Sequence, residues 1–144
     1  MTVETSASPE QVREALLDFS PQRPERWPGI TPSFYEVYEV GETTAEIREG
    51  TKLPGLGGFW ARERYDWSSP DTVRWEVVES NFCAPGSYVS ATLHPREGGG
   101  TRVELRWDRT GTSRMGKFMG KLVRATKGKP VADSFAKGLK KLET

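Results

Sequence analysis

The sequence is poor in the residues that build metal sites and disulfides. Its 144 residues include one cysteine, Cys83, and one histidine, His94. A structural zinc site takes about four Cys or His ligands, so this class of site is excluded, and no motif predicts another metal or cofactor. A single cysteine forms no disulfide within the chain, and we therefore expect a protein of the reducing cytoplasm.

Long apolar runs and nucleotide-binding motifs are also missing. No apolar stretch approaches the roughly 20 residues of a membrane-spanning helix, and the N-terminus lacks the basic and apolar segments of a signal peptide. The glycine-rich stretch at 55–58 lacks the lysine and the strand-to-helix context of a phosphate loop. The sequence therefore predicts neither stable membrane insertion nor a nucleotide cofactor.

Positive charge is concentrated near the C-terminus. Residues 111–144 hold nine Lys and Arg residues against Asp133 and Glu143, a net charge of +7 in a chain whose overall net charge is +1. The basic residues alternate with apolar ones at helical spacing, which is typical of the solvated face of a helix. Contact with nucleic acid or anionic lipid is the alternative. We expect no nucleic-acid partner, because no aromatic residue is predicted among the exposed basic residues for base stacking.

Local patterns predict helices on both sides of a strand-rich middle. Ser8, Pro9 and Gln11 have the chemistry of a helix start, and the apolar spacing that follows predicts a helix over 9–19. A short strand over 2–6 precedes this helix, and a short second helix carrying Trp27 follows it. Alternation with a period of two predicts strands at 33–40, 43–51, 59–68, 72–80, 87–95 and 101–110. Helical spacing returns over 113–142, with a kink or break expected at the glycine and proline of 128–130.

The order of these elements predicts the fold class. Short connections between consecutive strands imply an antiparallel meander with one apolar face, which includes Tyr65, Trp75 and Trp107. Such a face must be covered, and the last helix is the longest element available. We predict an α+β protein, a single domain over residues 1–144. Its curved seven-stranded antiparallel sheet would wrap around a long C-terminal helix, with two short helices after the first strand.

This order of elements resembles the START-like, pollen-allergen-like superfamily, whose bacterial members are often labelled polyketide cyclase/dehydrase and lipid transport proteins. Four short segments carry the resemblance: ASPEQV at 7–12, WPGI at 27–30, PGS at 85–87 and GGTRV at 99–103. The resemblance covers nearly the whole chain. It implies a helix-grip fold with a cavity between sheet and long helix, usually for apolar small molecules, in carriers, cyclases, dehydratases or regulatory binding domains.

Parity along the strands places several polar residues on the inner face. Glu49, Glu63, Glu79 and Arg109 continue the inward alternation toward one end of the sheet, where two loops and the start of the last helix meet. In the resembling family this end is commonly the cavity mouth. Glu63, Glu79 and Arg109 are therefore candidate catalytic residues, since an inward carboxyl group or an arginine could serve acid–base chemistry or stabilise an enolate. The alternative is a structural ion pair of Arg109 with Glu79 or Glu63.

Apolar and aromatic residues predict the walls of the cavity. The candidate ligand-binding residues are Trp27, Tyr65, Trp75, Val77, Val89, Ala91, Trp107, Met115, Met119 and Leu122. A fully packed core is the alternative. The connection at 52–58 is longer than a tight hairpin needs, and its leucines, Leu53 and Leu56, predict a flap over the ligand. An ordinary surface loop packed on the last helix is the alternative.

Two functions fit these expectations, and neither needs a cofactor. The first is a carrier or sensor that binds an apolar small molecule, such as a lipid or a polyketide-like compound. The second is a cyclase or dehydratase that folds a poly-ketone-like substrate in the cavity and uses the carboxylate and arginine cluster at its mouth.

Overall fold

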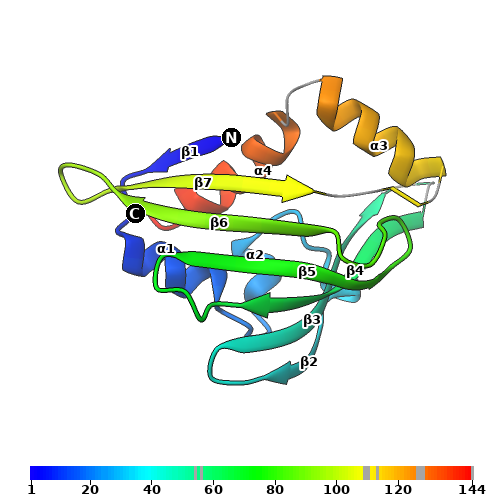
Figure 1. The fold of residues 1–144 in the computed structure, drawn as a ribbon, viewed down its shortest axis with the longest axis horizontal. Helices are drawn as coiled ribbons and strands as arrows, with labels where there is room; N and C mark the ends of the chain where they lie inside the picture. Colours follow the sequence, from blue (N-terminus) through cyan, green and yellow to red (C-terminus); the bar gives the residue numbers. More distant parts are fainter. Residues whose placement is uncertain (54, 56, 109–110, 113, 126–128, 144) are drawn as a thin grey trace.

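One sheet of seven strands runs through the structure in the order β1-β7-β6-β5-β4-β3-β2, with every neighbouring pair antiparallel. This computed structural model describes residues 1–53, 55, 57–108, 111–112, 114–125 and 129–143. The strands are β1 (Thr2–Thr5), β2 (Glu36–Val40), β3 (Thr44–Leu53), β4 (Gly57–Asp66), β5 (Thr72–Ser80), β6 (Tyr88–Pro95) and β7 (Thr101–Asp108). The helices are α1 (Pro9–Leu16), α2 (Arg23–Arg26), the 3-10 helix η1 (Pro32–Phe34), α3 (Arg114–Ala125) and α4 (Lys129–Lys140). In Figure 1, α1, α2 and α4 lie on one side of the sheet, so the predicted α+β class is confirmed.

The predicted start of the first helix is confirmed. The Ser8 hydroxyl accepts a hydrogen bond from the Gln11 amide at 3.2 Å, and the Gln11 side chain accepts one from the Ser8 amide at 2.9 Å. This reciprocal pair satisfies two backbone donors that a helix start otherwise leaves free. The helix is shorter than predicted and ends at Leu16, whose carbonyl accepts a hydrogen bond from the side chain of Arg23.

The core lies between the inner face of the sheet, α1 and α4. Tyr65, Val73 and Val103 from three strands are buried, as their parity predicts. Burying such side chains supplies about 1.5–3 kcal/mol each relative to leaving them exposed. α4 closes this core through Leu139, which is buried, and through Phe135, whose ring stacks on Trp27 with centroids 5.2 Å apart.

The hairpin between β3 and β4 is tighter than the sequence predicts. Leu53 pairs with Gly57, so the connection is confined to 54–56 and there is no loop over 52–58. Gly57 adopts a φ of 75°, a backbone conformation that residues other than glycine rarely adopt, and this allows a short turn between the two strands. The argument for a flap from excess loop length is therefore wrong. Leu53 belongs to β3, and Leu56 lies outside the described residues.

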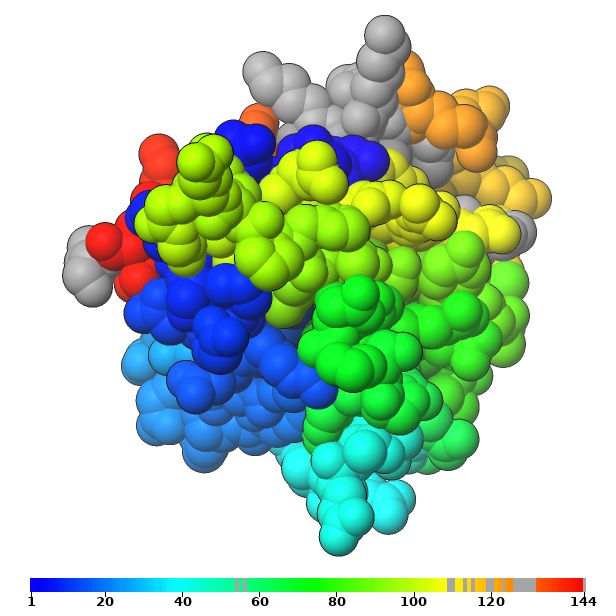
Figure 2. Space-filling view, turned by 60° about the vertical axis from the view of Figure 1, so that its left-hand side comes forward, coloured from blue at the N-terminus to red at the C-terminus, as the bar shows by residue number. Residues whose placement is uncertain are grey.

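The C-terminal helical region is divided into α3 and α4, so the predicted break is confirmed. α4 begins at Lys129 with Pro130 in its first turn, where the missing amide hydrogen costs nothing. α3, orange in Figures 1 and 2, stands at the rim of the molecule and does not continue the axis of α4. Phe118 is 61% exposed and Leu122 40% exposed, so the prediction that the apolar residues of the last helix cover the sheet is wrong for these two side chains.

This exposure also corrects the description of the basic helix surface. Phe118 follows the exposed Lys117, so an aromatic ring does stand among the basic residues of α3. The physical reason is that the chain restarts as α4, whose own apolar residues cover the sheet in place of α3. No helix among the described residues has the length and apolar character needed to cross a membrane.

Candidate functional site

Three connections meet at one end of the sheet, as the sequence predicts. The Asn81 amide nitrogen donates to the Gly58 carbonyl at 2.8 Å, and its oxygen accepts from the Trp60 amide at 2.9 Å. Asn81 therefore ties the β3–β4 hairpin to the residues after β5. The Thr112 amide donates to the Phe82 carbonyl at 2.9 Å, which attaches the segment before α3 to the same place.

A cavity of about 170 Å³ lies at this end. Its walls come from β3, β4, the residues after β5 and the residues after α2, namely Gly29, Ile30, Glu49, Gly50, Thr51, Phe59, Ala61, Glu63 and Phe82. The rings of Phe59 and Phe82 meet edge to face with centroids 5.1 Å apart and supply an apolar wall. The cavity is partly open to solvent, and its volume is close to that of an enclosed cavity of about 150 Å³ that holds benzene in another protein, so a molecule with one ring fits the volume.

Two carboxyl groups reach this cavity from neighbouring strands. Glu63 of β4 pairs across the sheet with Ile47 and Val77, and only 4% of its surface is exposed. Glu49 of β3 pairs with Ala61, and its side chain is 13% exposed. The predicted inward orientation of both is confirmed. Among the described residues no group of three or more His, Cys, Asp or Glu side chains is arranged to hold a metal ion.

Glu79 does not belong to this site, and its predicted inward orientation is wrong. The pairing of β4 with β5 slips by one residue, because Glu63 pairs with Val77 but Arg62 pairs with Glu79. The residue between them, Val78, is the extra residue of a β-bulge. The residues of β5 that follow it therefore lie on the face of the sheet opposite to the one that simple alternation predicts. The Glu79 side chain is 63% exposed on the outer face, 4.0 Å from Arg62.

Arg109, the third candidate catalytic residue, lies outside the described residues, so its predicted pairing with Glu63 or Glu79 remains a prediction. The outward turn of Glu79 separates it from Glu63, so the structure does not bring these two carboxyl groups together.

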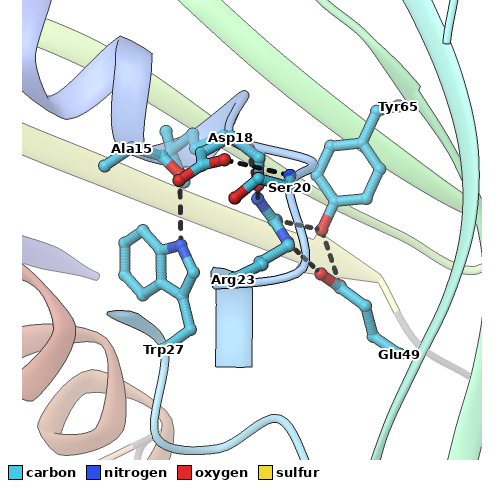
Figure 3. A network of polar contacts seen from close by, with 8 residues as sticks. Ala15, Asp18, Ser20, Arg23, Trp27, Glu49 and Tyr65 are labelled. Carbon is cyan, nitrogen blue, oxygen red and sulfur yellow. Dashed lines mark hydrogen bonds and ion pairs between the residues drawn. The ribbon is translucent and has the colours of Figure 1, made fainter. Parts of the chain in front are cut away.

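Behind Glu49 lies a buried arginine, Arg23, whose hydrogen bonds are shown in Figure 3. Its Nε donates to Glu49 Oε1 at 2.5 Å, and its Nη2 donates to the Tyr65 hydroxyl at 3.0 Å. Its Nη1 donates to the carbonyls of Leu16 and Asp18 at 2.8 and 2.9 Å. The Tyr65 hydroxyl in turn donates to Glu49 Oε2 at 2.7 Å, which closes a ring of three side chains. The network therefore joins the end of α1 to β3 and β4.

The electrostatics of the network keep Arg23 charged and Tyr65 neutral. Burial alone would lower the pKa of Arg23, but attraction to Glu49 and Tyr65 raises it above its ordinary value. Burial raises the pKa of Tyr65 well above 10, and the charge of Glu49 adds to this effect. The pKa of the nearby Tyr35 is also raised, because burial brings it to about 12. The Tyr35 hydroxyl is buried and has no hydrogen-bond partner among the described residues.

The sequence does not predict this role for Arg23. It lies in a short polar stretch between prolines, and no periodicity there marks it as buried. The one available signal is Glu49, because an inward carboxylate requires a partner, but spacing alone does not say which arginine provides it. Phe19, and Tyr65 of β4, add to the burial of Arg23, since its guanidinium lies 5.0 and 5.2 Å from the centres of their rings.

Most of the predicted ligand-binding residues pack in the core and do not line this cavity. Tyr65 belongs to the network, and Trp75 stacks on its ring with centroids 5.2 Å apart. Trp27 donates its ring N–H to the Ala15 carbonyl at 3.2 Å. Val77 and Ala91 are buried, Val89 and Trp107 are half-buried cross-strand partners, and Leu122 is exposed on α3. The side chains of Met115 and Met119 lie outside the described residues.

Comparison with known proteins agrees with the fold described above. The family model for polyketide cyclase/dehydrase and lipid transport proteins matches residues 1–144. An aromatase/cyclase, Zhui from Streptomyces sp. R1128, superposes with a TM-score of 0.74 at 16% identity, over 96% of this chain and 88% of that one. A START superfamily protein from Mycobacterium smegmatis gives a TM-score of 0.73 at 14% identity, over 99% and 96%. The lipid transfer and protein localization domain of human StarD13 gives 0.67 at 14% identity, over 96% and 73%.

At these identities the superpositions establish the helix-grip fold alone, since proteins that share a fold differ in function. No curated protein matches the sequence.

Proposed function

The chain belongs to the polyketide cyclase/dehydrase and lipid transport family, and on this basis we propose that it is a carrier or sensor that binds a small apolar molecule. The binding site is the cavity between β3, β4 and the residues that follow α2 and β5. A molecule with a ring, such as part of a polyketide-like compound, is the class of ligand that fits. The single cysteine supports a cytoplasmic location.

The observation that carries this proposal is the composition of the cavity wall. Phe59, Phe82 and Ile30 provide apolar surface, and Glu49, Thr51 and Glu63 provide a few polar groups, which is the usual make-up of a small-molecule site. The Arg23 network holds Glu49 in place beside the cavity. Such preorganisation lowers the entropy that a ligand must lose when it binds.

Titration with single-ring compounds and short acyl compounds, followed by protein NMR, tests the proposal. We expect shifts that concentrate on the amides of 49–51 and 59–63. Ala61→Leu adds a larger side chain to the cavity wall and should weaken binding at least tenfold; because Ala61 is buried, the NMR spectrum of the variant also has to show that it is folded. Val78→Leu, on the outer face of the neighbouring strand, is the matched control and should bind normally. No shift with any compound, or equal binding by Ala61→Leu, would contradict the proposal.

An enzymatic role as a cyclase or dehydratase is the second candidate, and Glu63 supports it. A carboxyl group that is almost wholly buried beside an apolar cavity is a suitable general acid or base for a bound ketone. We expect Glu63→Gln to abolish turnover of a poly-ketone substrate while leaving its binding within threefold. Glu79→Gln should have no effect, because Glu79 faces the solvent. Normal turnover by Glu63→Gln would remove this candidate.

A further inference from the structure

The polar side of the cavity has a feature that specifies the ligand further: two of its described side chains, Glu49 and Thr51, offer hydrogen-bond acceptors. Three polar side chains line the cavity, those of Glu49, Thr51 and Glu63. A carboxylate has no hydrogen to donate, so Glu49, which is ionised against Arg23, can only accept. Each of its oxygens already accepts one bond, from Arg23 and from Tyr65, and a carboxylate oxygen has room for a second.

Thr51 is restricted to the same role by its own hydrogen bond. A threonine hydroxyl has one hydrogen and two lone pairs. The Thr51 hydrogen is directed to the carbonyl of Gly29, so the oxygen offers lone pairs alone to a ligand. The carbonyl of Gly50, also on the wall, accepts the Thr31 amide at 2.8 Å and is likewise an acceptor.

We propose that the cavity selects a single-ring molecule whose polar end donates hydrogen bonds, such as a phenol or a benzylic amine. The ring would lie against Phe59 and Phe82, and the hydroxyl or amino group would point to Thr51 and Glu49. A carboxylate or ketone of the same size would instead place oxygen lone pairs against oxygen lone pairs. This inference rests on the proposed function, since it specifies the ligand of the same cavity.

Four probes of nearly equal size test the inference by calorimetry or NMR titration: toluene, phenol, benzylamine and benzaldehyde. Toluene measures the apolar cavity alone. One hydrogen bond contributes about 1 kcal/mol, which corresponds to about fivefold in affinity. Phenol and benzylamine should therefore bind at least fivefold more tightly than toluene, and benzaldehyde should bind no more tightly than toluene.

Variants of the wall locate the effect. Thr51→Val keeps the shape and removes the acceptor, and Thr51→Ala removes the acceptor with a smaller side chain. Each should reduce the advantage of phenol over toluene to twofold or less while toluene binds as before. Thr72→Val is the control, because it makes the same chemical change at the other end of β5, away from the cavity, and should leave all four affinities unchanged. If Thr51→Val does not fold, Thr51→Ala decides the question.

The outcomes distinguish failure of the hydrogen-bond donor inference from failure of the proposed ligand-binding function. Binding of toluene with no preference for phenol or benzylamine would overturn the donor inference and leave a general apolar site. Tighter binding of benzaldehyde than of phenol would also overturn it. Failure of every probe to bind, toluene included, would instead contradict the proposed function itself.

Discussion

Replacing Arg23 with methionine tests whether the buried network stabilises the fold. Arg23→Met has a similar length and no charge, so it leaves Glu49 in a nearly buried position without its cation. It also removes the donors to Tyr65 and to the carbonyls of Leu16 and Asp18. Breaking a buried ion pair by removing one partner costs about 3–5 kcal/mol. A domain is stable by about 5–15 kcal/mol in total, so the loss is a large share of the stability.

The control for this experiment lies in the same helix. Arg26 also pairs with a carboxylate, Asp18, but at 3.9 Å and with side chains 35% and 26% exposed. Exposed pairs of this kind contribute about 0–1 kcal/mol, so Arg26→Met should be nearly neutral. The double variant Arg23→Met with Glu49→Leu removes both charges and should recover part of the loss, since an apolar pair replaces a buried ionic one.

Urea unfolding at pH 7, followed by tryptophan fluorescence, measures these differences. If the free energy of unfolding depends on urea concentration with the same slope in all variants, a shift of the unfolding midpoint reports a change in stability. Equal losses for Arg23→Met and Arg26→Met would refute the reasoning, and so would a double variant less stable than Arg23→Met alone.

Three further predictions concern other parts of the structure. Gly138→Ala should lower the melting temperature although alanine favours helices, because the new methyl group would lie 2.3 Å from the ring of Trp27, and overpacking of this kind costs about 1–3 kcal/mol. Tyr65→Phe should change how the free energy of unfolding falls at alkaline pH. The folded pKa of Tyr65 is raised above 10, so its contribution is complete below pH 10 and is lost above it by about 1.4 kcal/mol per pH unit; unfolding at pH 9 and pH 11 should show a smaller decline in the variant. Asn81→Ala removes the oxygen that accepts the Trp60 amide, so hydrogen exchange at that amide should be at least tenfold faster, and an unchanged rate would contradict the bond.

Features that depend on neighbours in the sequence could be predicted. The start of α1 follows from Ser8, Pro9 and Gln11 alone, because a helix cap is built within four residues. The order of strands likewise follows from short connections, since these leave antiparallel neighbours as the simplest arrangement. The break before α4 follows from the chemistry of glycine and proline.

Features that depend on distant contacts could not be predicted. Glu63 faces inward as its parity indicates, but Glu79 lies after a bulge that no local pattern marks. The partner of Glu49 is Arg23, 26 residues earlier, and the pairing depends on the position of the chain after α1, where the carbonyls of Leu16 and Asp18 also hold Arg23. The direction of α3 depends on its attachment to the residues after β5, which its own apolar stripe does not encode.

The bulge at Val78 has a consequence for how positions are matched between relatives. Val78 behaves as an inserted residue: without it, Glu63 and Arg62 would keep Val77 and Glu79 as their partners in a straight strand. Deletion of the Val78 codon would therefore give a β5 that is one residue shorter. The remaining residues would keep their faces of the sheet, and the strand would twist less at this point. An alignment drawn through β5 without a gap would assign the residue after Val78 to the cavity face, which is the wrong side of the sheet. At 14–16% identity, structure must therefore decide where the gap belongs before any site residue is carried from one protein to another.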